Sequence, residues 1–389
     1  MAKWLTCFYR LMYSFRVKNS LTMQIAQVIS FLESMAPPSL QEHYDNAGLI
    51  TGSPVWDCRG ILCSLDATEE VIEEAIAKNV NLVVAHHPIV FGGLKKINGK
   101  NYVERAVIRA IKNDIAVYAI HTNLDNVLHG VNGKMAAMIG LKNVSILSAK
   151  ENTLKKLFTF VPADHAEKVR NAIFEVGGGQ IGNYSECSFN VVGKGTFKAG
   201  EGSDPFVGSV GERHSEDEIK VEVIIPAQLE AKVVSAMRTA HPYEEVAYDV
   251  VNLSNKHPQI GSGIIGELER PVPENEFLVH LKTVFDLSVI RHTRLRRKPI
   301  VKAAICGGAG SFLITSALSA GADAYVTSDI KYHEFFDADD RILLADIGHY
   351  ESEQFTIDLL RENLERKFPN FAVLKTEVIT NPVYYFRGL

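Results

Sequence analysis

Cysteine is scarce in this sequence and never paired in a short motif. Five cysteines occur in 389 residues, and no two of them form a CxxC pair. An odd number of cysteines without such spacing argues against a disulfide framework and favours a reducing compartment. We therefore expect a cytoplasmic protein.

Long apolar runs and an excess of positive charge are also missing. The longest uncharged stretch, residues 303–322, is interrupted by Gly307, Gly308 and Gly310, whereas a membrane span needs about 20 mostly apolar residues. The 41 basic residues are outnumbered by 46 acidic ones, so the net charge is -5. Because a nucleic-acid-binding domain is usually clearly basic, we expect neither a membrane span nor a nucleic-acid partner.

What is present is the composition of a folded protein. Hydrophobic residues make up 46% of the chain and charged residues 22%, which excludes disorder, collagen and coiled coil as descriptions of the whole chain. At roughly 150 residues per domain, the length predicts two or three domains.

The first 22 residues differ from the rest. They carry four basic residues and no acidic one. Arg10 interrupts the apolar run at the start, so a secretory signal is poorly formed, and an organelle transit peptide is the alternative. From Met23 onward apolar residues recur at helical spacing. We expect residues 1–22 to be a disordered tail or a mis-assigned start.

Two outer parts of the chain alternate strand and helix patterns, which favours an α/β fold with a largely parallel sheet. We expect one α/β unit made of two halves, residues 23–148 and 257–389. The expected strands are 60–65, 81–85, 115–120, 300–305, 324–327 and 342–345, and the expected helices include 67–78, 103–112 and about 350–367.

The middle part, residues 149–256, has a different pattern. Two β-α-β patterns follow one another within about 100 residues, which is typical of a ferredoxin-like split βαβ module. A polar, glycine-rich stretch at 200–217 is expected to be a hairpin loop. We therefore expect a small α+β domain inserted into the α/β unit.

Potential metal ligands follow three of the expected strands. Imidazoles and carboxylates cluster directly after the strands 81–85, 115–120 and 342–345. Ligands of open α/β sheets bind outside the carboxyl ends of the strands, so these groups should meet at one edge. The six candidates are His86, His87, His121, Asp125, His349 and Glu353.

The helix at the end of the chain supports two of these candidates. Stepping back four and eight residues from Ile357 along its apolar stripe reaches Glu353 and His349. A buried glutamate is costly unless it is paired or metal-bound. The alternatives are satisfied polar residues at strand ends and a helix-dipole interaction of Glu353. Six candidates at three strand ends favour a metal site.

Weaker features lie nearby. Residues 306–311 follow a strand, and their backbone N–H groups either bind an anion or form a tight turn. Asp329 and His333 follow a fourth strand end and are candidates for the same site. Asp45 lies in a turn, where it either lines the pocket or satisfies the backbone.

These residues give the chain its resemblance to a known family. The chain is similar, over about residues 23–386, to the GTP cyclohydrolase I type 2 homologues, also called the Nif-three-like family. The segment HPYEEVAY at 241–248 resembles the longer bacterial members. The other matching segments are HYDNAGL (43–49), HHPIVFGG (86–93), HTNLD (121–125), CGGAGS (306–311), TSDIKYH (327–333) and DIGHYESE (346–353).

The resemblance implies a fold, an assembly and a metal site. The expected fold is an α/β unit with a dinuclear site and an inserted module similar to PII and CutA proteins. The expected assembly is a toroidal homohexamer. The resemblance also implies that His87, Asp125 and Glu353 hold one divalent ion. A second ion would be held by His86, His349 and the same Glu353, which then bridges the two ions.

For function we expect a metal-dependent hydrolase that acts on a nucleotide or a similar small anion. Mixed imidazole and carboxylate ligands suit zinc first, with manganese, iron or cobalt as alternatives. His121 and His333 are the candidate proton carriers. The alternative is a metal-bearing regulatory or binding protein without turnover, because filled metal positions favour structure and open ones favour catalysis.

Overall fold

The structure is a computed structural model that describes residues 23–386, and the chain divides into two compact units. Unit 1 combines the residues up to Lys142 with those from Gly266 onward, and unit 2 comprises Asn143–Ile265. Unit 2 is slightly wider than the segment 149–256 expected from the sequence. The expectation for residues 1–22 lies outside the described residues.

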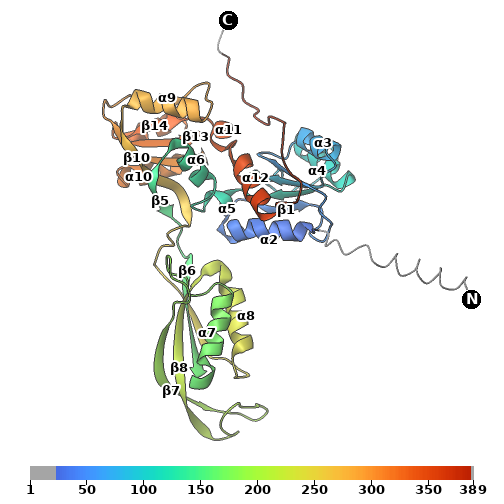
Figure 1. Cartoon of the computed structure of the whole chain (residues 1–389), viewed down its shortest axis with the longest axis vertical. Coiled ribbons are helices and arrows are strands. Elements are labelled where there is room, and N and C mark those ends of the chain that lie inside the picture. Colours follow the sequence, from blue (N-terminus) through green and yellow to red (C-terminus); the bar gives the residue numbers. More distant parts are fainter. Residues whose placement is uncertain (1–22, 387–389) are drawn as a thin grey trace, which may run out of the picture. The chain divides into compact units, whose positions relative to one another are not determined.

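The first sheet of unit 1 has five strands, four of them parallel (Figure 1). Every residue of its three central strands is buried, which is typical of a parallel sheet covered on both faces. The outer strand β1 is antiparallel to its neighbour. The order is β1 (Gly48–Thr51), β4 (Ala116–Ala119), β3 (Leu82–Ala85), β2 (Ile61–Ser64) and β15 (Val373–Lys375).

Two helices lie side by side against this sheet, α3 (Glu69–Ala77) and α4 (Tyr102–Lys112) (Figure 1). Thr68 and Asn101 cap their N-termini by accepting hydrogen bonds from backbone N–H groups, which satisfies donors that have no partner inside the helix. The chain enters this half through α2 (Ile25–Met35) and the short helix η1 (Pro38–Leu40).

The second sheet of unit 1 has a parallel centre of three strands, β12, β13 and β14. Its edge strand β11 is antiparallel to β14. At the other edge, β5 carries the chain into unit 2 and β10 carries it back into unit 1. The order is β11 (Arg291–His292), β14 (Leu343–Asp346), β13 (Ala324–Ser328), β12 (Ile300–Ala309), β10 (Gly261–Val272) and β5 (Lys142–Ala149).

The remaining helices of unit 1 have at most 12 residues each. None of those found among the described residues is long and apolar enough to cross a membrane. They are α5 (Thr122–Asp125), α6 (Val131–Ile139), α9 (Glu274–Val284), η4 (Ser311–Leu313), α10 (Ile314–Ser319), η5 (Tyr332–Ala338), α11 (His349–Glu353) and α12 (Thr356–Lys367).

Unit 2 has the element order β-α-β-β-α-β. Its four strands form an antiparallel sheet in the order β7-β8-β6-β9, and α7 and α8 lie along one face (Figure 1). This is the connectivity of a split βαβ module. The elements are β6 (Leu154–Pro162), η2 (Ala163–His165), α7 (Ala166–Glu175), β7 (Phe189–Lys198), β8 (Arg213–Pro226), η3 (Ala227–Leu229), α8 (Glu230–Ala240) and β9 (Tyr248–Asn252).

Two local predictions differ from the structure. The helix expected at 350–367 is broken into α11 and α12, because the chain turns at Gln354 and Phe355. The loop expected at 200–217 ends earlier, since β8 already begins at Arg213. Polar residues that alternate along an exposed strand end do not resemble a buried strand, which explains the second difference.

Candidate metal centre

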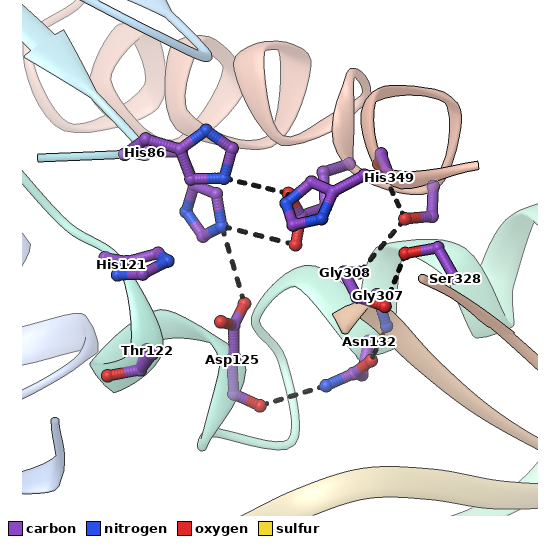
Figure 2. Close-up of polar contacts among 12 residues, drawn as sticks. His86, His121, Thr122, Asp125, Asn132, Gly307, Gly308, Ser328 and His349 are labelled. Carbon is purple, nitrogen blue, oxygen red and sulfur yellow. Dashed lines mark hydrogen bonds and ion pairs between the residues drawn. The ribbon is translucent and has the colours of Figure 1, made fainter. Parts of the chain in front are cut away.

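Six polar side chains meet in unit 1, where the ends of strands from both sheets come together (Figure 2). His86 and His87 follow β3, and His121 follows β4. Asp125 ends the short helix α5, while His349 and Glu353 lie on α11. The ring centroids of His86 and His87 are 4.9 Å apart, and those of His87 and His349 are 5.4 Å apart.

The ring of His86 has an orientation that the backbone fixes. Its Nδ1 atom lies 2.8 Å from the carbonyl oxygen of Ile120. A carbonyl oxygen can only accept, so Nδ1 carries the proton and Nε2 of the neutral ring presents a lone pair. This Nε2 faces two carboxylates, at 3.6 Å from Asp125 Oδ1 and 3.9 Å from Glu353 Oε1.

Two of these buried atoms, His86 Nε2 and Asp125 Oδ1, have no hydrogen-bond partner within residues 23–386. His86 is fully buried, so water does not solvate its ring. Buried polar atoms are nearly always satisfied, and an unsatisfied one needs a specific reason. A cation between the ring nitrogen and the carboxylates would supply that reason.

Glu353 is the residue that the other ligands share. It is 3% exposed, and its Oε2 atom lies 2.9 Å from His87 Nε2 and 3.1 Å from His349 Nε2. The spacing of four residues places His349 and Glu353 on one face of α11. Glu353 therefore directs one oxygen toward His86 and the other toward His87 and His349.

Three carboxylates orient the remaining imidazoles by hydrogen bonds to their Nδ1 atoms. Asp66 Oδ1 lies 2.8 Å from His87 Nδ1, and Asp329 Oδ2 lies 2.6 Å from His349 Nδ1. In the same way, Asp45 Oδ1 lies 2.8 Å from His121 Nδ1. Carboxylates that hold the outer nitrogen of an imidazole are typical of metal sites, where they fix the ring and raise its basicity.

The charges of the cluster are strongly coupled. Burial and the nearby Glu353 raise the pKa of Asp125 well above its usual range. Burial also opposes ionisation of Glu353, yet hydrogen bonds with His349 and His87 hold its pKa well below that of an ordinary glutamate. Two buried carboxylates this close cannot both ionise without positive charge between them, which a divalent ion would provide.

The potential ligand atoms fall into overlapping groups of three. One group is His86, Asp125 and Glu353, and another is His87, His349 and Glu353, with the atoms of each group within 4.8 Å of one another. This grouping differs from the pairing that the family resemblance implies, which joins His87 to Asp125 and His86 to His349. Glu353 belongs to both groups in either case. A third group combines His86, His87 and His121.

The glycine segment at 306–311 makes room for Glu353. Residues up to Ala309 belong to β12, so most of the segment is strand. The N–H of Gly307 donates to Asn132 Oδ1 at 2.8 Å, and that of Gly308 donates to Ser352 Oγ at 3.0 Å (Figure 2). These two N–H groups already have partners and are not available to bind an anion.

The structure separates the two candidate proton carriers. The ring of His121 lies beside those of His86 and His87, with both centroid distances 5.3 Å. His333 instead lies on η5, exposed to solvent, where its ring packs against Tyr332 and Phe336. His333 does not belong to any ligand group found among residues 23–386, and its role as a proton carrier stays a prediction.

A pocket of about 870 Å³ opens onto the cluster. His87 and His349 form part of its wall, so a small molecule in the pocket would reach the group that contains them. Strand β11 contributes Arg291, and the C-terminal segment contributes Asn381 and Tyr385. The other lining residues are Leu65, Asp66, Val289, Asp329, Ile330, Asp346, Gly348, Tyr350, Glu351, Pro382 and Val383.

Residues 23–382 match the family model Duf34/NIF3 (NGG1p interacting factor 3). The chain belongs to the Duf34/NIF3 family. This match covers both units and includes every residue of the cluster.

Individual members of the Duf34/NIF3 family are similar over nearly their whole length. A GTP cyclohydrolase 1 type 2 homolog of Halalkalibacterium halodurans is 39% identical over 92% of this chain and 96% of its own. The homolog of Bacillus subtilis is 35% identical over 92% of this chain and 97% of its own. The crystal structure of a Bacillus cereus protein related to NIF3 covers 94% of this chain and all of its own, at 38% identity and a TM-score of 0.81.

Sequence reasoning missed one residue of this Duf34/NIF3 site. Asp66 holds His87, and its other oxygen accepts a hydrogen bond from Thr380 in the C-terminal segment. A signal was present, because Asp66 comes two residues after the buried strand β2, at the same sheet edge as the histidines. The bond to Thr380 had no such signal, since nothing in a sequence predicts where an irregular segment crosses the surface.

Proposed function

We propose that this chain binds two divalent metal ions and acts as a metal-dependent hydrolase on a nucleotide or a similar anionic small molecule. The observation that carries the proposal is the buried Nε2 lone pair of His86, which faces two carboxylate oxygens without any donor between them. The donor set of imidazoles and carboxylates fits zinc first, with manganese, iron or cobalt as alternatives.

Glu353 would bridge the two ions, because its two oxygens point into different ligand groups. When bound, paired divalent ions activate water and stabilise the negative charge that develops during hydrolysis. The protein holds the ligand rings in place through hydrogen bonds. The carbonyl of Ile120 holds His86, Asp66 holds His87 and Asp329 holds His349.

His121 is the residue that we assign to proton transfer. Burial opposes ionisation of Asp45, but hydrogen bonds from His121 and Thr122 hold its pKa at about 2. Asp45 is therefore an anion at neutral pH and keeps the proton of His121 on Nδ1. The Nε2 atom is then the basic nitrogen that can take a proton from a reacting group.

Charge alone gives only weak support for an anionic substrate. Two divalent ions would be offset not only by Asp125 and Glu353 but also by Asp66 and Asp329 behind the histidines. The pocket adds little to this, because its one arginine, Arg291, is already paired with Asp346. The name GTP cyclohydrolase 1 type 2 homolog of the relatives makes GTP the first substrate to test.

The test compares Glu353→Gln with the matched variant Glu351→Gln. Both residues lie on α11, but Glu351 faces Asn381 of the C-terminal segment instead of the histidines. We expect elemental analysis to find two ions per chain in the wild type and in Glu351→Gln, and almost none in Glu353→Gln. We expect metal-loaded wild type to turn over GTP or another nucleotide.

Two outcomes would contradict the proposal separately. Full occupancy in Glu353→Gln would refute the bridging role. Normal metal content without turnover of any nucleotide would refute the hydrolase and leave the alternative, a metal-bearing regulatory or binding protein.

Self-association belongs to the same proposal. We expect the toroidal homohexamer that the family resemblance implies, and light scattering should give about six times the 43.0 kDa of one chain. A monomeric or dimeric mass would contradict this part without affecting the metal site.

A further inference from the structure

Unit 2 contains a second pocket, of about 730 Å³, that plays no part in the proposed hydrolase. It lies entirely within unit 2, among strands β6, β7 and β8 and the loops that follow β7 and α8. All six residues of the metal cluster belong to unit 1. A ligand in this pocket would therefore contact a different set of residues.

The pocket lies on the face of the sheet that the helices leave open. Successive side chains of β8 point to opposite faces, and Val221 and Val223 pack in the core with α7 and α8. Glu218 and Lys220 are therefore on the other face, in the pocket. In the neighbouring strand, Gly193 pairs with Glu218, so this part of the floor carries no side chain.

Three aromatic rings form a wall of the pocket. Phe197 is at the end of β7, Phe206 lies in the following loop, and Tyr243 follows α8. The ring of Tyr243 contacts both phenylalanines, with centroid distances of 6.3 Å to Phe197 and 6.1 Å to Phe206. Such a wall accepts an apolar or aromatic body, and the negative faces of the rings also attract a cation.

Glu218 is the polar group inside this apolar surrounding. It is only 8% exposed, and its Oε1 accepts a hydrogen bond from the hydroxyl of Tyr243 at 2.9 Å. No ion pair joins it to a basic side chain within residues 23–386. A β-carbon at Gly195 would lie 2.1 Å from its other oxygen, so the glycine makes space for the carboxylate. A buried carboxylate without a cation is costly.

The pocket lining carries three glutamates and three lysines, and the lysines are the better paired of the two. Two of its three lysines are already paired with acids outside its lining, Lys194 with Asp217 at 3.2 Å and Lys220 with Glu222 at 2.8 Å. Glu244, which also lines the pocket, accepts a hydrogen bond from the backbone N–H of Asp204. Neither it nor its neighbour Glu245 has an ion pair in the part of the chain described here.

We propose that this pocket binds a small organic cation, an amine with an apolar or aromatic body. The ammonium group would pair with Glu218, and the body would lie against Phe197, Phe206 and Tyr243. A concave, mostly apolar pocket with a small number of well-placed polar groups is the usual form of a small-molecule site. The ligand supplies the positive charge that the protein itself does not place beside Glu218.

Calorimetry on the full chain tests this with three probes of similar size. The probes are the 2-phenylethylammonium ion, the neutral 2-phenylethanol and the 3-phenylpropionate anion. We expect the ammonium ion to bind at least about tenfold more tightly than the alcohol, and the anion not to bind. Equal affinity for the ammonium ion and the alcohol, preference for the anion, or no binding of the ammonium ion would each overturn the proposal.

Variants test whether the preference for the ammonium ion depends on Glu218. Glu218→Gln keeps the shape and should remove the preference for the ammonium ion, whereas the control Glu216→Gln should keep it, because Glu216 pairs with His214 away from the pocket lining. If Glu218→Gln fails to fold, Tyr243→Phe still tests the site, since it keeps the carboxylate charge and should preserve the preference while changing the affinity. Glu353→Gln should bind the probes normally, so failure of this proposal is distinguishable from failure of the hydrolase.

Discussion

A β-carbon at Gly308 would lie 2.3 Å from Oε1 of Glu353. Any larger residue at position 308 would therefore push the carboxylate of Glu353 out of its place. The residue also has φ +62, a conformation that costs a residue with a side chain roughly 1–2 kcal/mol. We predict that Gly308→Ala displaces Glu353 and lowers the metal content, which elemental analysis measures.

Gly321 provides the matched control for that substitution. It also has a positive φ, +72, but a β-carbon there would meet nothing within 4 Å. Gly321→Ala should lose a similar free energy of unfolding and keep its metal. Equal metal content in the two variants would show that the contact with Glu353 is unimportant.

The grouping of the ligands makes a second prediction. Replacing both His86 and Asp125 disrupts only one of the two groups that share Glu353. We expect the double variant His86→Ala/Asp125→Asn to keep one ion per chain, and His86→Ala/His349→Ala, which takes a ligand from each group, to lose both. The reverse result would support the pairing that the family resemblance implies. Elemental analysis after identical dialysis decides between them.

Asp66 is predicted to act on the metal through His87. Asp66→Asn keeps the shape but removes the charge that holds His87 Nδ1. Loss of such a partner typically weakens metal affinity by about 10–100-fold. Competition with a chromophoric chelator measures this affinity. Asp358→Asn is the control, because Asp358 pairs with Lys375 at the surface, and an equal loss in both variants would argue against an orienting role.

Asp45 should make the free energy of unfolding depend on pH. Its folded pKa of about 2 lies below the ordinary aspartate value of 3.8, and its side chain is fully buried. A lowered carboxyl pKa stabilises the fold above the unfolded pKa, and this stabilisation disappears as the pH falls through the folded pKa. Asp45→Asn should therefore cost about 2 kcal/mol at pH 7 and progressively less between pH 4 and pH 2.

Urea unfolding of the two proteins at several pH values checks this prediction. The quantity to follow is the difference in free energy of unfolding between wild type and Asp45→Asn. A difference that stays constant from pH 7 to pH 3 would mean that the Asp45–His121 pair contributes no charge-dependent stability.

The buried parallel strands were predictable because each is a short run of apolar residues. The stretches containing β2, β3 and β4 are short apolar runs, and each was expected within about one residue of its position. The outer strands β1, β11 and β15 were not expected. They have two to four residues, of which only some are buried, so their formation depends on a neighbouring strand that a local pattern cannot reveal.

The candidate ligands were recognisable for a related reason. His86, His121 and His349 each come directly after or close to a buried strand, and the carboxyl ends of parallel strands meet at one edge. The sequence did not reveal which imidazole shares a group with which carboxylate. That depends on side-chain rotation, for instance the bond that turns His86 Nδ1 toward the carbonyl of Ile120.

The strand β15 has a consequence for the order of events during synthesis. It pairs with β2, whose residues lie about 300 positions earlier in the chain. At about 5–20 residues per second, a ribosome needs roughly 15–60 s to make the intervening chain. Throughout that interval the outer edge of β2 lacks its final partner, and unpaired strand edges invite pairing with other chains. A nascent chain of this protein therefore carries an open sheet edge until its last residues are made, a period in which chaperone binding would be most useful.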